Sequence, residues 1–179
     1  AIINQREVGM DVEDYEHGLY AALREDPDVI LIGEMRSPET IETALVAAET
    51  GHLVFSTIHT NSAIDSIDRI VGVFPENKQP QIRLQLSMTL RAVLAQQLVP
   101  RAAGRGRAAA CELMMVTPPI RNLIRDGKTP QMQSYLLAGT KDGSVTMDNF
   151  LCELANKGII MPETAVEAAE DPTEMRQKM

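Results

Sequence analysis

Two titratable side chains each follow an apolar segment with the composition of a buried strand. Glu34 comes after Val-Ile-Leu-Ile-Gly at 29–33, and His59 comes after His-Leu-Val-Phe-Ser-Thr-Ile at 52–58. Apolar runs of this length predict strands that are buried on both faces. In an open parallel sheet, ligands bind beyond the carboxyl ends of the strands. We therefore expect Glu34 and His59 to lie together at that edge of the sheet.

A carboxylate in this position is typical of P-loop nucleotide hydrolases, where it activates the water that attacks the γ-phosphate while Mg²⁺ neutralises charge. The magnesium-contacting Asp of such strands is replaced here by Gly33, so any Mg²⁺ contact involves Glu34 alone or is indirect. The sequence contains no G-x-x-x-x-G-K-[ST] phosphate loop. The basic Gly/Arg turn at 104–107 is not such a loop, because no Lys-Ser/Thr and no helix follow it at the right spacing. Taken singly, Glu34 could equally be a solvated carboxylate at a helix start, and His59 a satisfied loop histidine.

The elements that position these residues alternate between strands and helices. Capping and stop residues predict helices from Asp14 to before Pro27 and from Ser37-Pro38 to Gly51. Apolar spacing predicts a further helix after Ser62, a longer helix over about 79–97, and a strand after the turn at 104–107. This order predicts an α/β fold with a parallel sheet covered by helices. Beyond Thr117 only short helices are expected, so we divide the chain into 1–117 and a helical subdomain, 118–179.

Composition excludes several classes of protein. The net charge is −8, which argues against bulk binding to nucleic acid or to anionic membranes. The two cysteines, Cys111 and Cys152, form neither a disulfide framework nor a zinc motif. No apolar run reaches the length of a membrane span, and no signal peptide opens the chain. Because the first residues lack an initiator Met and read like the inside of a strand, we expect the chain to continue a longer protein.

Four long motifs carry a resemblance to the secretion ATPase superfamily, and most closely to its pilus-retraction branch. They are NQREVG (4–9), ALREDPDVILIGEMR (22–36), ETALVAAETGHLVFSTIHTNSAIDSIDRI (42–70) and TPPIRNLIRDGK (117–128). The resemblance implies a RecA-like P-loop core that lacks its Walker A part, followed by the helical subdomain. The tetracysteine zinc motif of the assembly and type II secretion ATPases is missing, which favours the retraction branch.

The resemblance also assigns roles to particular residues. Glu34 in the Walker B segment is implied to be the catalytic carboxylate, and His59 is interpreted as a sensor of the γ-phosphate. The histidine box is implied to include His52, Thr57, His59 and Thr60. His52 stands at the amino end of its strand, so we expect a structural or inter-subunit role for it. A segment associated with retraction is implied at Ile120, Arg121, Asn122, Leu123, Ile124 and Arg125.

Two of these, Arg121 and Arg125, lie four residues apart on one helix, and like charges at that spacing are mildly destabilising. They form either a solvated basic face or a surface for an acidic partner, and we favour the partner.

The function implied by the resemblance is that of a cytoplasmic motor. Members form rings of six at the inner face of the cytoplasmic membrane, bind ATP with Mg²⁺ between subunits, and drive type IV pilus retraction in twitching motility. The implied partners are five identical subunits and an inner-membrane platform protein, with no nucleic acid and with membrane association only through partners. A pilus assembly or type II secretion ATPase, or an inactive oligomerisation and coupling module, remain as alternatives.

The chain departs from the family pattern in three ways. It lacks the family's PAS-like domain, and it lacks the first part of the motor domain with the Walker A loop and the acidic Asp box. Ser37 stands where the family usually has Asp, a mild change because both residues cap helices well. We therefore expect the ATPase activity to belong to the full-length protein, and the isolated chain to be inactive.

Overall fold

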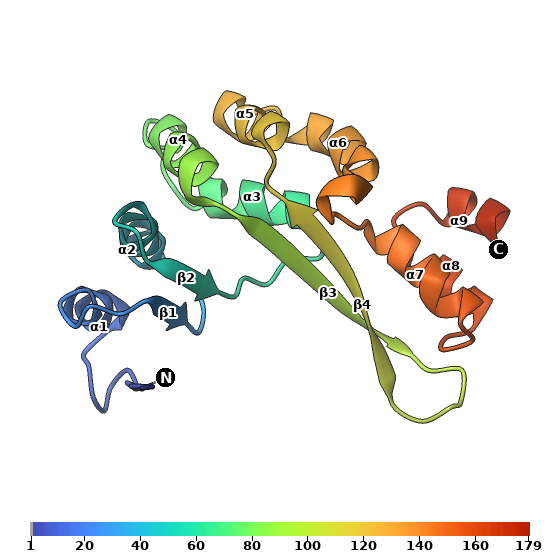
Figure 1. Ribbon diagram of the computed structural model, residues 1–179, viewed down its shortest axis with the longest axis horizontal. Coiled ribbons are helices and arrows are strands. Elements are labelled where there is room, and N and C mark those ends of the chain that lie inside the picture. The colour runs from blue at the N-terminus through green and yellow to red at the C-terminus, as the bar shows by residue number, and fades with distance from the viewer. Residues whose placement is uncertain (1) are drawn as a thin grey trace. The chain divides into compact units, whose positions relative to one another are not determined.

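The computed structural model describes residues 2–179 (Figure 1). The chain divides into two compact units. The first unit comprises Ala1–His59 and Ile70–Thr89, and the second comprises Thr60–Arg69 and Leu90–Met179. The chain thus passes between the units after His59, after Arg69 and after Thr89. The division into a domain of residues 1–117 and a helical subdomain of residues 118–179 stays a prediction.

The first unit is built on a pair of parallel strands. Its elements are α1 (Tyr15–Ala22), β1 (Val29–Ile32), α2 (Pro38–Glu49), β2 (Leu53–Ser56), α4 (Gln79–Thr89) and the last turn of α3 (Ala63–Gly72). Val29 pairs with Leu53, and Ile32 pairs with Ser56. Asp14 caps α1, and Ser37 caps α2 directly before Pro38, so both predicted helix starts are confirmed.

The core of the first unit lies on one face of this sheet. Leu19 of α1 and Ala44 and Ala47 of α2 pack there with Ile30 and Ile32. Residues of the opposite face are exposed by about half or more, and we call them the open sheet face: Val29, Leu31, Leu53 and Phe55. The prediction that both strands are buried on both faces is therefore wrong. The two helices cover a single face, and β1 alternates between exposed and buried residues.

The second unit contains a long antiparallel hairpin, in which β3 (Ala92–Pro100) pairs with β4 (Arg107–Met115). The prediction of one helix over about 79–97 is wrong, because α4 ends at Thr89 and residues 92–100 are a strand. The strand after the Gly/Arg turn is confirmed, but it pairs with β3 and does not join the parallel sheet. Gly104 and Gly106 both have positive φ, which lets the chain reverse between the strands.

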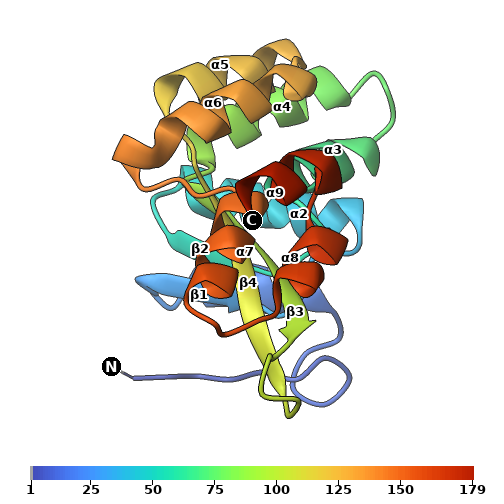
Figure 2. The same cartoon turned by 90° about the vertical axis from the view of Figure 1, so that its right-hand side faces the viewer.

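Helices make up the rest of the second unit, as predicted for the chain beyond Thr117. They are α5 (Pro118–Asp126), α6 (Met132–Ala138), α7 (Met147–Asn156), α8 (Pro162–Ala168), α9 (Pro172–Lys178) and the 3₁₀ segments η1 (Thr129–Gln131) and η2 (Gly139–Asp142). Helices α7 and α8 pack along the hairpin (Figure 2). The shared core includes Val99 and Ala110 of the hairpin, Leu151 of α7, Ala165 of α8 and Met175 of α9. None of the helices that the structure describes has the length and the apolar character needed to cross a lipid bilayer.

Candidate functional site

Glu34 and His59 meet beyond the carboxyl ends of β1 and β2. The Oε1 atom of Glu34 lies 3.0 Å from Nε2 of His59, and its Oε2 atom lies 2.7 Å from Nη2 of Arg36. The predicted proximity of Glu34 and His59 is therefore confirmed. The side chain of Glu34 is 21% exposed, whereas those of Arg36 and His59 are 79% and 76% exposed. The carboxylate is thus held by two cation-forming groups that are themselves accessible to solvent.

Backbone pairing continues past the strands and fixes the position of these side chains. The hydroxyl of Thr57 donates a hydrogen bond to the carbonyl oxygen of Gly33 at 2.5 Å, and the N–H of Met35 donates to the carbonyl oxygen of Thr57 at 3.1 Å. These two bonds join the segment that bears Glu34 to the segment that leads to His59. Thr57 therefore contributes to the site indirectly: its hydrogen bonds fix the backbone next to Glu34.

The electrostatics of the site favour an ionised carboxylate. The pKa of Glu34 is lowered from its ordinary value, first by the hydrogen bond from Arg36 and then by the charges of Arg36 and His59, against an opposing effect of desolvation. Glu34 in turn raises the pKa of Arg36. An ionised carboxylate can accept a proton from water. Its exposed partners, Arg36 and His59, can instead bind an anionic ligand.

Arg36 has no predicted role, although the sequence carries a signal for it. It follows Glu34 by two residues directly after β1, and if the chain continues in the strand conformation, residues at that spacing point to the same side. An acid and a base separated by one residue after a strand therefore predict an ion pair.

His52 lies at the other end of β2 and has a structural environment. Its Nδ1 atom lies 3.0 Å from the carbonyl oxygen of Ala47 and 3.2 Å from the hydroxyl of Thr50. Because a carbonyl oxygen can only accept, Nδ1 carries the proton and donates it to Ala47. The carbonyl oxygen of Ala47 also accepts from the backbone N–H of His52 at 3.2 Å and from the hydroxyl of Thr50 at 3.0 Å, so the ring of His52 strengthens the end of α2.

Thr60 follows His59 directly but belongs to the second unit. Its hydroxyl lies 2.6 Å from the hydroxyl of Ser66, which donates to the carbonyl oxygen of Ser62 at 2.9 Å. Since Ser66 uses its proton for Ser62, Thr60 donates to Ser66. The histidine box therefore divides, with Thr57 and His59 near Glu34 and Thr60 bonded to the first turn of α3.

The predicted retraction segment forms α5, which the structure divides into a buried face and an outer face. Ile120, Leu123 and Ile124 belong to the core, with at most 9% of each exposed. Asn122 and Arg125 are exposed, and Arg121 is half-buried. Only the polar residues of this segment are available to a partner.

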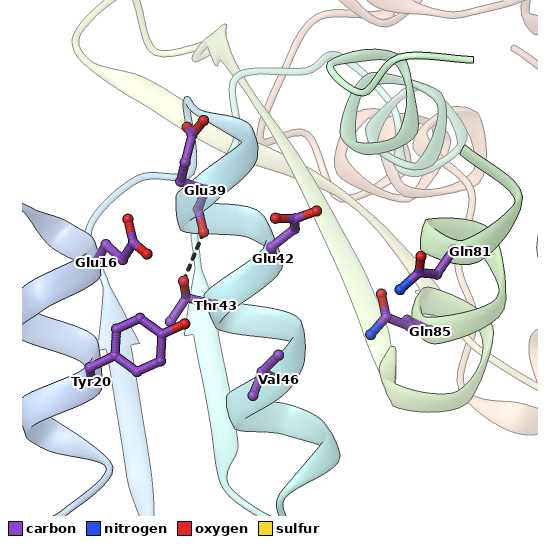
Figure 3. Close-up of a pocket in the computed structure, with 8 residues that line it drawn as sticks. All are labelled: Glu16, Tyr20, Glu39, Glu42, Thr43, Val46, Gln81 and Gln85. Atoms are coloured by element: carbon purple, nitrogen blue, oxygen red, sulfur yellow. Dashed lines mark hydrogen bonds between the residues drawn. The ribbon is translucent and has the colours of Figure 1, made fainter. Parts of the chain in front are cut away.

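A separate hollow of about 300 Å³ lies among α1, α2 and α4 of the first unit (Figure 3). Its lining residues are Glu16, Tyr20, Glu39, Glu42, Thr43, Val46, Gln81 and Gln85. The hydroxyl of Thr43 donates to the carbonyl oxygen of Glu39 at 2.8 Å. Three carboxylates repel a phosphate group, so this hollow does not have the chemistry of a nucleotide site.

The fold is that of an α/β protein, and Glu34, Arg36 and His59 lie at the carboxyl ends of its parallel strands, the edge at which ligands bind in sheets of this kind. A family model described as "Type II/IV secretion system protein" matches residues 3–165, and the chain belongs to this family. The chain is 50% identical over 171 residues to the type IV pilus retraction ATPase PilT of Pseudomonas aeruginosa. It is 47% identical over 175 residues to a twitching motility protein of Neisseria gonorrhoeae. These alignments cover 96% and 98% of the chain but only 49% and 47% of the relatives, so the chain spans about half their length.

Solved structures agree with these relatives. The crystal structure of the pilus retraction motor PilT with bound ADP matches with a TM-score of 0.87 and 51% identity, over 98% of this chain and 49% of that one. The ATPase DotB of Legionella pneumophila matches with a TM-score of 0.80 and 27% identity, over 92% of this chain and 44% of that one. The predicted fold class, a partial RecA-like core with a helical region after it, is confirmed.

Proposed function

We propose that this chain is the C-terminal part of a hexameric motor ATPase that drives type IV pilus retraction. The observation that carries the proposal is the contact of Glu34 with Arg36 and His59 at the carboxyl ends of two parallel strands. It is supported by two relatives, one a retraction ATPase and the other a twitching motility protein, that match over nearly the whole chain. A type II secretion protein of Pseudomonas aeruginosa matches only 65% of the chain, which favours the retraction branch.

In this proposal Glu34 is the general base that takes a proton from the attacking water. Arg36 and His59 keep its carboxylate ionised in the resting state. Both side chains are largely exposed, so they can turn from Glu34 toward the phosphates of ATP when the nucleotide arrives. His59 then reports the γ-phosphate to α3, the helix that begins a few residues later.

Magnesium fits this site only in part. Among residues 2–179 no group of three or more His, Cys, Asp or Glu side chains is arranged to hold a metal ion. Mg²⁺ is commonly held by one or two carboxylates together with substrate phosphates and water. Glu34 is therefore the residue of this chain that would contact the ion, which would supply charge neutralisation at the phosphates.

The proposed assembly has six copies at the inner face of the cytoplasmic membrane, with an inner-membrane platform protein as partner. The outer face of α5 is the proposed contact with that machinery. The proposed domains are 1–117, the C-terminal part of the ATPase domain, and 118–179, the helical subdomain.

The test of this function is Glu34→Gln in the full-length protein. The substitution keeps the size of the side chain but removes the basic carboxylate, so ATP still binds while turnover falls by about 10²–10⁴-fold. Glu39→Gln is the matched control, because it removes a carboxylate of the same unit that does not contact Glu34, and turnover should stay within about twofold. Turnover near that of the wild type in Glu34→Gln would exclude Glu34 as the base.

A further inference from the structure

A second carboxylate, Glu112, is buried in the middle of β4. Only 1% of the residue is exposed, and the strand around it is otherwise built mainly from small and apolar residues. An ionised carboxylate is almost never buried without compensation. Here the compensation comes from the backbone. Oε1 accepts a hydrogen bond from the N–H of Ala63 at 2.7 Å, and Oε2 accepts one from the N–H of Met147 at 3.3 Å.

Both donors are the first residues of helices. Ala63 begins α3 and Met147 begins α7. Each helix also has a hydroxyl cap, because Ser62 accepts from the N–H of Asp65 at 3.1 Å and Thr146 accepts from the N–H of Asn149 at 3.2 Å. The caps serve N–H groups further along each first turn, which leaves the first N–H of both helices to Glu112. Two positive helix ends therefore share one negative charge.

The two helices differ in how much else holds them. The segment before α7 is paired with β4, since Leu113 and Val145 exchange backbone hydrogen bonds of 2.8 and 2.9 Å and the N–H of Met115 donates to the hydroxyl of Ser144 at 3.0 Å. The first turn of α3 is instead the place where Thr60 of the histidine box is bonded through Ser66. Further along α3 the hydroxyl of Thr129 donates to the carboxylate of Asp68 at 2.9 Å, so loss of Glu112 should loosen the first turn of α3 more than the rest of that helix or the start of α7.

We propose that Glu112 is a positioning residue for Thr60 of the histidine box. Its carboxylate fixes the first turn of α3, to which Thr60 is bonded, and joins that turn to the first turn of α7 in the helical region. The effect on catalysis rests on the proposed ATPase function. The anchoring of α3 does not, and it can be measured separately.

The test uses Glu112→Met in the full-length protein. A methionine has a similar length but no carboxylate oxygen, so neither N–H group keeps its acceptor. We expect amide hydrogen exchange at Ala63 to become faster by about tenfold or more, which is the size of effect given by an unsatisfied buried group. We expect kcat to fall by about tenfold as well, while the affinity for ADP stays within about twofold.

Thr146→Ala is the matched control. It removes the cap of α7 and lowers thermal stability by an amount typical of a lost cap, but it leaves the bond between Glu112 and Ala63 in place. We expect its kcat to stay within about twofold of the wild type. Equal losses of kcat in both variants, or unchanged exchange at Ala63 in Glu112→Met, would overturn the proposal.

A second variant covers the case in which Glu112→Met does not fold. Ala63→Pro removes only the N–H that α3 donates, at a helix position that favours proline. A fall in kcat in that variant supports the proposal, and a wild-type kcat overturns it. If the wild-type protein itself hydrolyses no ATP, the proposed function fails, and the exchange rate at Ala63 still decides whether Glu112 anchors α3.

Discussion

The carboxylate of Glu34 is paired with two residues, Arg36 and His59. Arg36 keeps its charge at every physiological pH. Arg36 is the larger cause of the lowered pKa of Glu34. The ionised state of Glu34 is therefore set mainly by a permanent charge. In our proposal His59 is the partner that responds to ligand.

The two histidines of the box give a paired prediction. His59→Ala in the full-length protein removes a group that contacts the γ-phosphate in our proposal, so ATP affinity and turnover should fall while ADP affinity changes little. His52→Ala should leave the ratio of ATP to ADP affinity unchanged, because His52 bonds to Ala47 at the opposite end of the same strand. Calorimetry with a non-hydrolysable ATP analogue and with ADP measures both ratios. An equal loss of both affinities in His59→Ala would exclude the sensor.

Removal of Arg36 should change the pH dependence of activity. In Arg36→Gln the pKa of Glu34 moves back up toward its ordinary value, because its main cause of depression is lost. The acid limb of the profile of kcat/KM against pH should then move to higher pH. The pairing of Glu34 with Arg36 also stabilises the fold only above the ordinary pKa of Glu, and that contribution is lost as pH falls through the lowered pKa. An acid limb at the wild-type position would show that Glu34 does not control it.

At the scale of elements, local signals predicted the helices well. Asp14 and Ser37-Pro38 mark helix starts through hydrogen bonds within a few residues, so the sequence alone is sufficient. The strand 92–100 was missed because its state depends on a partner. Its Ala, Leu and Gln residues are good helix formers, and nine pairings with β4 override that preference.

The difference between local signals and contacts with distant residues also explains what could be predicted of the site. The proximity of Glu34 and His59 followed from the general position of ligand sites in parallel sheets, and the structure confirms it. The role of Glu112 could not be predicted, because Ala63 and Met147 are distant in sequence from it and from each other. The available signal was a carboxylate within an apolar strand. It indicates that the carboxylate has a hydrogen-bond donor, but it does not indicate which residue supplies the donor.

Helix α5 gives a prediction about coupling to a partner. Arg125→Glu reverses a charge on a side chain that is 53% exposed, and its surface ion pair with Asp126 contributes little to stability. The melting temperature and the ATPase rate should therefore stay near the wild type, while retraction in cells is lost. Arg105→Glu, at the exposed tip of the hairpin, is the control and should retain retraction. Normal twitching with Arg125→Glu would remove α5 from the proposed contact.

At the scale of the whole molecule, the chain spans about half the length of its relatives. It has no phosphate loop in its sequence, and so it lacks the backbone cradle and the Lys that hold the β- and γ-phosphates. We predict that residues 1–179 alone bind ATP no more tightly than about millimolar in calorimetry. Binding at micromolar concentration would show that the nucleotide site lies elsewhere in this chain.

The open sheet face should make the isolated chain prone to self-association. Val29, Leu31, Leu53 and Phe55 lie on two strands that each have an unpaired edge within the described residues. Exposed apolar strands with unpaired edges are templates for pairing with other chains. A preparation of this chain alone should therefore bind hydrophobic dyes and form larger particles as its concentration rises. Charged substitutions at Leu31 and Phe55 should keep it in solution, because neither side chain belongs to the core on the other face.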